Sequence, residues 1–135
     1  MDSDDGGRNS NPGAGSGSER AAIVRAALDY IEGWFDGDVA RMERVLHPEL
    51  ARQTLQDDGS VRTLTREMML AFTAEGGGRS EDAPNRQLEV EVDRLDAPLA
   101  TAVVRSHLYV DHLHLVRTQA GWKIVSMLWQ RRRPP

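Results

Sequence analysis

The short run VDHLHLV at residues 110–116 contains two histidines, His112 and His114, separated by one residue. Residues two apart on a strand point to the same face, so the two imidazoles could share a metal ion, transfer protons or line a pocket. A metal site needs a third protein ligand, and only His47 or a distant carboxylate such as Glu32 is available. We therefore expect no bound metal, and we interpret the histidines as the polar part of a mostly apolar pocket.

Aromatic and long apolar side chains provide the other candidates for a pocket wall. Tyr30 and Trp34 lie one helical turn apart, and Trp129 ends a strand-like run. Arg52 alternates with apolar residues of its strand and is either solvated or placed to bind an anion at the pocket mouth. The predicted ligand-binding residues are Tyr30, Trp34, His47, Arg52, Met69, Phe72, His112, His114, Met127 and Trp129.

Length and composition restrict the class of protein. The chain has 135 residues, no cysteine and a net charge of −4, which indicates one domain, excludes thiolate chemistry and argues against nucleic acid as a partner. No apolar run is long enough for a membrane span, and no secretory signal is visible, so we expect a soluble, cytoplasmic protein. Lys123 is the sole lysine, a bias that suggests a GC-rich bacterial genome.

The apolar periodicity predicts an α+β domain in which helices precede a meander of strands. Residues 1–18 are expected to be a disordered leader, 19–131 the folded domain and 132–135 a tail. Asp38 and Thr65 are predicted helix caps. The expected elements are helices at about 19–36, 38–47 and from 65, ended by the glycines at 76–78, a hairpin of 50–55 with 61–64, and four antiparallel strands near 88–92, 100–108, 109–117 and 122–130.

Three stretches carry a resemblance to a known superfamily: YIEGWFDGDVARM at 30–42, LHPEL at 46–50 and GWKIVSMLW at 121–129. They resemble the nuclear transport factor 2-like proteins, a superfamily that includes ketosteroid isomerases and SnoaL-like cyclases. Within it, the chain is most similar to the bacterial "putative lumazine-binding" group, over about residues 19–131. The resemblance implies a cone-shaped α+β barrel with three N-terminal helices packed on a curved antiparallel sheet.

The same resemblance implies a ligand pocket at the wide end of the cone and a homodimer formed through the outer face of the sheet. Lined up with ketosteroid isomerase, Tyr30 matches the phenol that donates to the substrate oxygen, and His114 falls at the neighbouring carboxylic acid. The general base falls near Thr54, which cannot abstract a proton from carbon, so an isomerase is not expected.

The resemblance leaves three functions open. One is the binding of a small organic molecule, without a cofactor. The second is a SnoaL-like enzyme that uses His47, His112 or His114 as acid or base, with Tyr30 as a further catalytic candidate. The third is a structural or partner-binding dimer with a filled cavity.

The strand alternation predicts which side chains share a face. If Trp129 faces the pocket, Met127 and Val125 should face it too, and His112 should accompany His114. The opposite, outward face is then expected to carry Trp122 and the alternate residues of the neighbouring strand, which are His107, Tyr109, Asp111, Leu113 and Leu115. On that face Asp111 would pair with Arg105 or Arg117 across strands.

Overall fold

The computed structural model describes residues 12–79 and 85–132. Helix α1 (Pro12–Asp36), α2 (Val39–Val45) and α3 (Arg66–Ala74) come first, with a hairpin of strands between α2 and α3. The predicted caps are confirmed, because Asp38 accepts a hydrogen bond from the Arg41 amide and Thr65 accepts one from the Met68 amide. None of the described helices is long and apolar enough to cross a membrane.

Helix α1 begins at Pro12, earlier than the predicted start at residue 19. Proline suits the first position of a helix because the amide it lacks would have no partner there. The other part of the predicted leader, residues 1–11, lies outside the described residues, as do residues 133–135 of the predicted tail.

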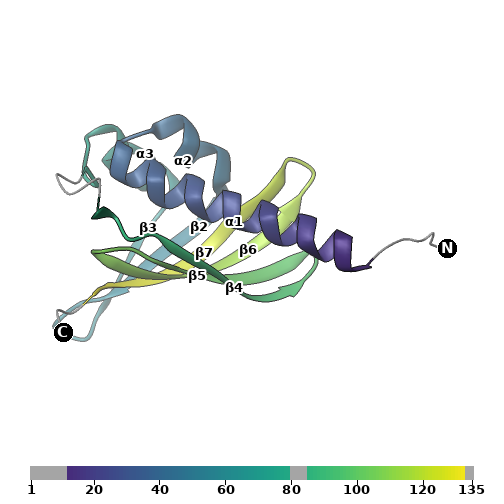
Figure 1. The fold of residues 1–135 in the computed structure, drawn as a ribbon. Coiled ribbons are helices and arrows are strands. Elements are labelled where there is room, and N and C mark those ends of the chain that lie inside the picture. Colours follow the sequence, from purple (N-terminus) through teal and green to yellow (C-terminus); the bar gives the residue numbers. More distant parts are fainter. Residues whose placement is uncertain (1–11, 80–84, 133–135) are drawn as a thin grey trace.

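Six strands form one sheet in the order β3-β2-β7-β6-β5-β4. Every neighbouring pair is antiparallel except β2 and β7, which run parallel. The sheet is therefore mixed, whereas the prediction was a wholly antiparallel sheet. Figure 1 shows the three helices on one side of this sheet, with α1 lying across it. The strands are β2 (Leu46–Leu55), β3 (Val61–Leu64), β4 (Glu89–Asp96), β5 (Leu99–Arg105), β6 (Tyr109–Thr118) and β7 (Gly121–Arg131).

The face of β6 that packs against the helices differs from the predicted face. Tyr109, Asp111, Leu113 and Leu115 are buried, whereas the residues between them point to the outer side of the sheet. The apolar leucines decide this choice, because burying them against the helices removes more apolar surface from water than burying the two histidines would.

A register shift between β6 and β7 changes the predicted alternation of the last strand. His114 pairs with Ser126 and Leu115 pairs with Ile124, so Val125 is an extra residue between them. As a result Ile124 and Met127 are both buried, and the alternation starts again on the other side of Val125.

Trp122 therefore faces the helices, and the prediction that it faces the outer side of the sheet is wrong. It is 6% exposed, and its indole Nε1 donates to Glu19 of α1 at 3.3 Å. The side chain thus joins the end of the last strand to the first helix.

Candidate functional site

A cavity of about 260 Å³ lies between the C-terminal ends of α1 and α3 and the neighbouring ends of four strand segments. Most of its wall is aromatic, and the charged groups among the described residues of the wall are all guanidinium groups. The lining residues are Trp34, Arg52, Arg62, Leu64, Phe72, Gly77, Tyr109 and Trp129. They come from α1, β2, β3, α3 and the turn after it, β6 and β7, so the cavity forms only when the whole domain is folded.

Arg52 is the central polar residue of this cavity. Its side chain points to the helices because Arg52 pairs with the buried Leu64 of β3, and only 5% of the residue is exposed. The guanidinium carbon lies 4.3 Å from the ring centroid of Trp129 and 5.8 Å from that of Trp34. Such contacts with aromatic faces stabilise a guanidinium by about 0.5 to 2 kcal/mol. The Nε atom of Arg52 nevertheless has no hydrogen-bond partner.

A buried hydrogen-bonded pair, Tyr30 and Asp111, lies close to Arg52. The Tyr30 hydroxyl donates to Oδ1 of Asp111 at 2.9 Å, and both residues are at most 1% exposed. Burial raises the pKa of Asp111 to about 6, although the positive charge of Arg52 acts to lower it. Burial, with the nearby carboxylate of Asp111, also raises the pKa of Tyr30 well above its ordinary value. The phenol is therefore a permanent donor, whereas the carboxyl can change charge near neutral pH.

The turn after α3 packs directly on the indole of Trp34. A Cβ atom built on Gly78 would lie 2.4 Å from Nε1 of Trp34, and one on Gly77 would lie 3.3 Å from the far edge of the same ring. Only glycine lets the backbone come this close to the indole. The glycine run predicted to end α3 therefore also fixes one wall of the cavity.

The predicted site residues separate into three groups. Four of them, Trp34, Arg52, Phe72 and Trp129, line the cavity together. A second group, Tyr30, Met69 and Met127, belongs to the hydrophobic core behind it, at 0 to 2% exposed. The third group consists of the three histidines.

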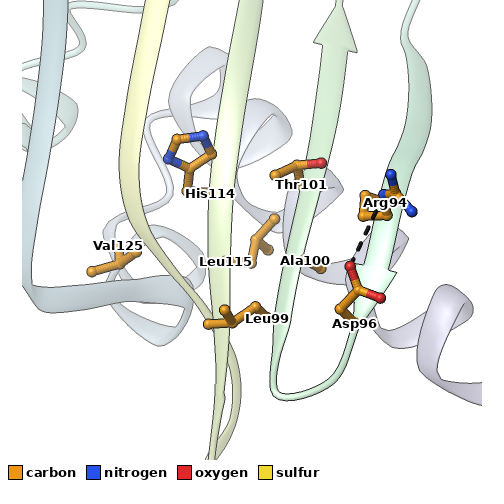
Figure 2. Close-up of a pocket in the computed structure, with 8 residues that line it drawn as sticks. All are labelled: Arg94, Asp96, Leu99, Ala100, Thr101, His114, Leu115 and Val125. Atoms are coloured by element: carbon orange, nitrogen blue, oxygen red, sulfur yellow. Dashed lines mark ion pairs between the residues drawn. The ribbon is translucent and has the colours of Figure 1, made fainter.

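The histidines lie away from the cavity, and their expected place in the cone is wrong. His112 and His114 point to the outer face of the sheet, where both are exposed. His114 Nδ1 is 3.0 Å from the Ser126 hydroxyl and borders a shallow hollow of about 360 Å³ with Leu99 and Thr101 (Figure 2). His47 stands at the start of β2, where its Nδ1 accepts a hydrogen bond from the amide of Glu49.

Three polar residues in or beside the cavity, Arg62, Tyr109 and Asp111, were not among the predicted ligand-binding residues, and neither were the lining residues Leu64 and Gly77. Arg62 pairs with Thr54 across the hairpin, which puts it on the same face as Arg52. Tyr109 and Asp111 share the inward face of β6. The predicted pairing of Asp111 with Arg105 or Arg117 is wrong, because Arg105 pairs with Glu89 and Glu91 and Arg117 with Glu19. The predicted hairpin register contained the signal for Arg62, since residues opposite each other share a face.

No group of three histidine or carboxylate side chains able to hold a metal ion occurs within residues 12–79 and 85–132. The arrangement around the cavity is suited to other chemistry. It combines flat aromatic walls, one buried and one exposed guanidinium, and a nearby carboxyl with a pKa of about 6.

Comparison with solved structures identifies the fold as nuclear transport factor 2-like. A protein of this fold from Silicibacter pomeroyi is 15% identical, with a TM-score of 0.70 and coverage of 87% of this chain and 98% of that one. Another from Shewanella baltica is also 15% identical, with a TM-score of 0.70 and coverage of 93% and 100%. Both are described as proteins of unknown function.

A third solved structure, described as ketosteroid isomerase-like, comes from Erwinia carotovora atroseptica. It is 12% identical, with a TM-score of 0.60 and coverage of 86% of this chain and 98% of that one. At this level of identity the three structures establish the fold alone, and they confirm the predicted fold class.

Residues 18–130 match the family described as "Putative lumazine-binding", and the chain belongs to that family. The resemblance seen in the sequence is thus confirmed at the level of both superfamily and family. No curated protein sequence matches the chain significantly.

Proposed function

We propose that this protein binds a small, planar organic molecule in the cavity between Trp34, Phe72 and Trp129. The observation that carries the proposal is an open space of about 260 Å³ whose wall is aromatic on several sides. Ligand sites are typically concave and mostly apolar, with a few fixed polar groups. A space slightly below the usual range of 300 to 1,000 Å³ suits a compact ligand of one or two fused rings.

The family description supports the same ligand class. Lumazine is a flat, bicyclic heteroaromatic molecule, and the description of the family is "Putative lumazine-binding". Indole rings bind such molecules by offset stacking or by edge contacts. We take lumazine as the first probe for this chain, because its size and shape suit the cavity.

A direct test compares two variants of the same helix. Lumazine binding is measured by isothermal titration calorimetry with the unchanged protein, with Phe72→Ala and with Met68→Ala. Phe72 lines the cavity, whereas Met68 is 40% exposed and lies outside the lining. We expect Phe72→Ala to weaken binding about tenfold or more and Met68→Ala to leave it unchanged. Equal affinities in all three proteins would contradict the proposal.

Native mass spectrometry of the protein purified from its own host gives an independent test. A small organic mass that is retained in native spectra and lost on denaturation would support binding. Repeated preparations without any such mass, together with no binding to lumazine and related planar compounds, would favour a structural role.

An enzymatic role is the second candidate, and Asp111 is the observation that favours it. A histidine acid or base has no support in the cavity, because all four histidines of the chain are described and none lines it. A carboxyl with a pKa of about 6 beside the Tyr30 phenol is suited to proton transfer. Exchange of deuterium from solvent into a bound ketone would support this role if Asp111→Asn abolished it.

We further propose that two copies associate through the outer face of the sheet. Leu55, Val61, Leu99 and Leu128 are 54 to 68% exposed there, which is unusual for large apolar side chains. Analytical ultracentrifugation should give the mass of a dimer, and Leu128→Glu should shift it toward the monomer. Met68→Glu on the helical side is the control, and a monomeric unchanged protein would refute the dimer.

The expected cellular setting stays a proposal as well. The composition is consistent with a cytoplasmic bacterial protein, since the arginine bias suggests a GC-rich genome. Fractionation of the source cells, followed by immunodetection, would test the location.

A further inference from the structure

We infer that the ligand of this cavity carries an oxyanion, a carboxylate or phosphate group attached to its planar part, and that Arg52 and Arg62 bind this group. This inference rests on the proposed function, because it concerns the same cavity and specifies the chemical class of its ligand. Three observations carry it: the charge of the wall, the lack of a carboxylate of the described residues within 4 Å of the Arg52 guanidinium, and the Nε donor of Arg52 that has no hydrogen-bond partner.

The wall of the cavity is positively charged, although the chain as a whole carries a net charge of −4. Within residues 12–79 and 85–132, Arg52 and Arg62 are the only charged residues that line it, and none of the lining residues is a carboxylate. A third guanidinium, that of Arg131, lies 5.5 Å from the ring centroid of Tyr109, which also lines the cavity. A local concentration of positive charge in an acidic protein attracts and retains anions.

Arg52 is held without a carboxylate partner within 4 Å. Among the ion pairs of residues 12–79 and 85–132, none involves Arg52, Arg62 or Arg131. A buried guanidinium without such a partner is costly, since desolvation is not compensated by a bound anion. A buried donor left unpaired, such as Nε of Arg52, is rare enough in folded proteins to call for an explanation. An anionic ligand would supply the missing partner.

The Arg52 guanidinium keeps at least one donor free. Its carbon lies over the ring of Trp129, at 4.3 Å from the ring centroid, and its Nε donor has no hydrogen-bond partner. A guanidinium carries five N–H donors in one plane, and Nε forms one edge of this plane together with a terminal nitrogen. An oxyanion accepts two parallel hydrogen bonds from that edge in a bidentate arrangement.

Asp111 sets a condition on this inference, because its carboxylate is close enough to interact with Arg52. It stays outside the lining and accepts a hydrogen bond from Tyr30 on the core side. Its negative charge offsets part of the charge of Arg52 but occupies none of the cavity. Arg62 is exposed and adds a second positive charge at the mouth.

The same geometry disfavours other ligand classes. A cationic ligand would meet two guanidinium groups and, among the residues that the structure describes, no lining carboxylate. A neutral aromatic ligand could fill the space but would add no negative charge beside the Arg52 guanidinium. A planar anion satisfies the aromatic wall and the cationic donors together.

A matched set of probes separates these ligand classes. Binding of 2-naphthoate, 2-naphthyl phosphate and the uncharged 2-naphthamide is measured by isothermal titration calorimetry at pH 7 and low ionic strength. The three compounds share one planar ring system and differ in charge. We expect at least one of the two anions to bind about tenfold or more tightly than the amide, the size expected for hydrogen bonds to a charged group.

Variants locate the effect on the two arginines. Arg62→Gln is an exposed change and should weaken binding of the preferred anion severalfold without affecting the amide. Arg52→Lys keeps the charge but loses the planar fork, and should weaken anion binding more strongly. Arg94→Gln is the control, because Arg94 lies on the outer hollow and is 75% exposed (Figure 2). Circular dichroism checks that each variant is folded.

The outcomes distinguish this inference from the proposed function. Tighter binding of an anion that depends on Arg52 and Arg62 supports both. Equal binding of the amide and the two anions supports a planar ligand and overturns the oxyanion. A preference for an anion that Arg62→Gln and Arg52→Lys leave unchanged also overturns the inference. Failure of all three probes, and of lumazine, overturns both.

Discussion

Replacing Asp111 by Asn should change how the stability of this protein depends on pH. Asp111 is 1% exposed, and burial raises its pKa to about 6 from an ordinary value of 3.8. Asn keeps an oxygen that can accept the hydrogen bond from the Tyr30 hydroxyl but cannot take up a proton. Comparing the two proteins therefore isolates the titration of a single buried carboxyl.

The sign follows from which state binds the proton more tightly. Because the folded pKa is the higher one, the folded protein holds a proton that the unfolded chain releases between pH 3.8 and about 6. The stabilisation by this proton is present below pH 3.8 and is lost as the pH rises through about 6. A pKa raised by this amount adds about 3 kcal/mol to the free energy of unfolding at low pH, and about 1.4 kcal/mol of this is lost between pH 5 and pH 8.

Urea denaturation followed by tryptophan fluorescence, at several pH values from 5 to 8, measures this difference. The free energy of unfolding of the unchanged protein, minus that of Asp111→Asn, should fall by about 1 to 1.5 kcal/mol from pH 5 to pH 8. The exposed Asp57→Asn is a matched control and should show no such change. Parallel pH profiles for the unchanged protein and Asp111→Asn would refute the assignment of a raised pKa to Asp111.

Three further results are expected. Gly78→Ala should lower the free energy of unfolding by about 1 to 3 kcal/mol in urea denaturation, because its Cβ would overlap the indole of Trp34; unchanged stability would contradict the close packing. Thr65→Ala should cost about 1 kcal/mol in the same assay through loss of the cap of α3, and no loss would contradict the cap. The affinity for 2-naphthoate should increase by up to about twentyfold from pH 7.5 to pH 5.5, as Asp111 becomes neutral and no longer offsets the charge of Arg52. Calorimetric titrations at both pH values would contradict this coupling if they gave equal affinities.

Local signals in the sequence predicted most of the fold. Asp38 and Thr65 cap the helices as expected, because a cap depends on a few neighbouring residues. The hairpin at Asp58 and Gly59 also forms, and Gly59 has a φ of +90°, which favours glycine. The parallel pairing of β2 with β7 was missed, since it joins segments far apart in the chain and leaves no local pattern.

The site was harder to predict because it depends on strand faces. Alternation shows that His112 and His114 share one face and Asp111 the other, but it does not by itself show which face is buried. The assumption that polar pocket residues would be histidines selected the wrong face. Val125 then shifted the alternation of β7, an irregularity that apolar runs conceal.

Asp111 shows why a buried charge is difficult to find from sequence alone. A carboxylate that stands next to His112 on a strand looks like a solvated residue, because most carboxylates are exposed. Its burial becomes acceptable only when Tyr30, 81 residues away in the chain, donates a hydrogen bond and Arg52 supplies a nearby positive charge. These partners lie on three separate elements, so only the folded structure brings them together.

The two faces of the sheet differ in a way that supports the proposed site on the helical side. The outer face carries the histidines in exposed positions, where polar groups cost little. The inner face holds Arg52 and Asp111, and α1 holds Tyr30 against it, in positions where apolar residues would pack at lower cost. A fold that needed only stability would gain by replacing them, so their burial beside an open, aromatic cavity is best explained by a ligand. Because the negative charge of Asp111 only partly offsets the positive charge of Arg52, that ligand should carry a negative charge of its own.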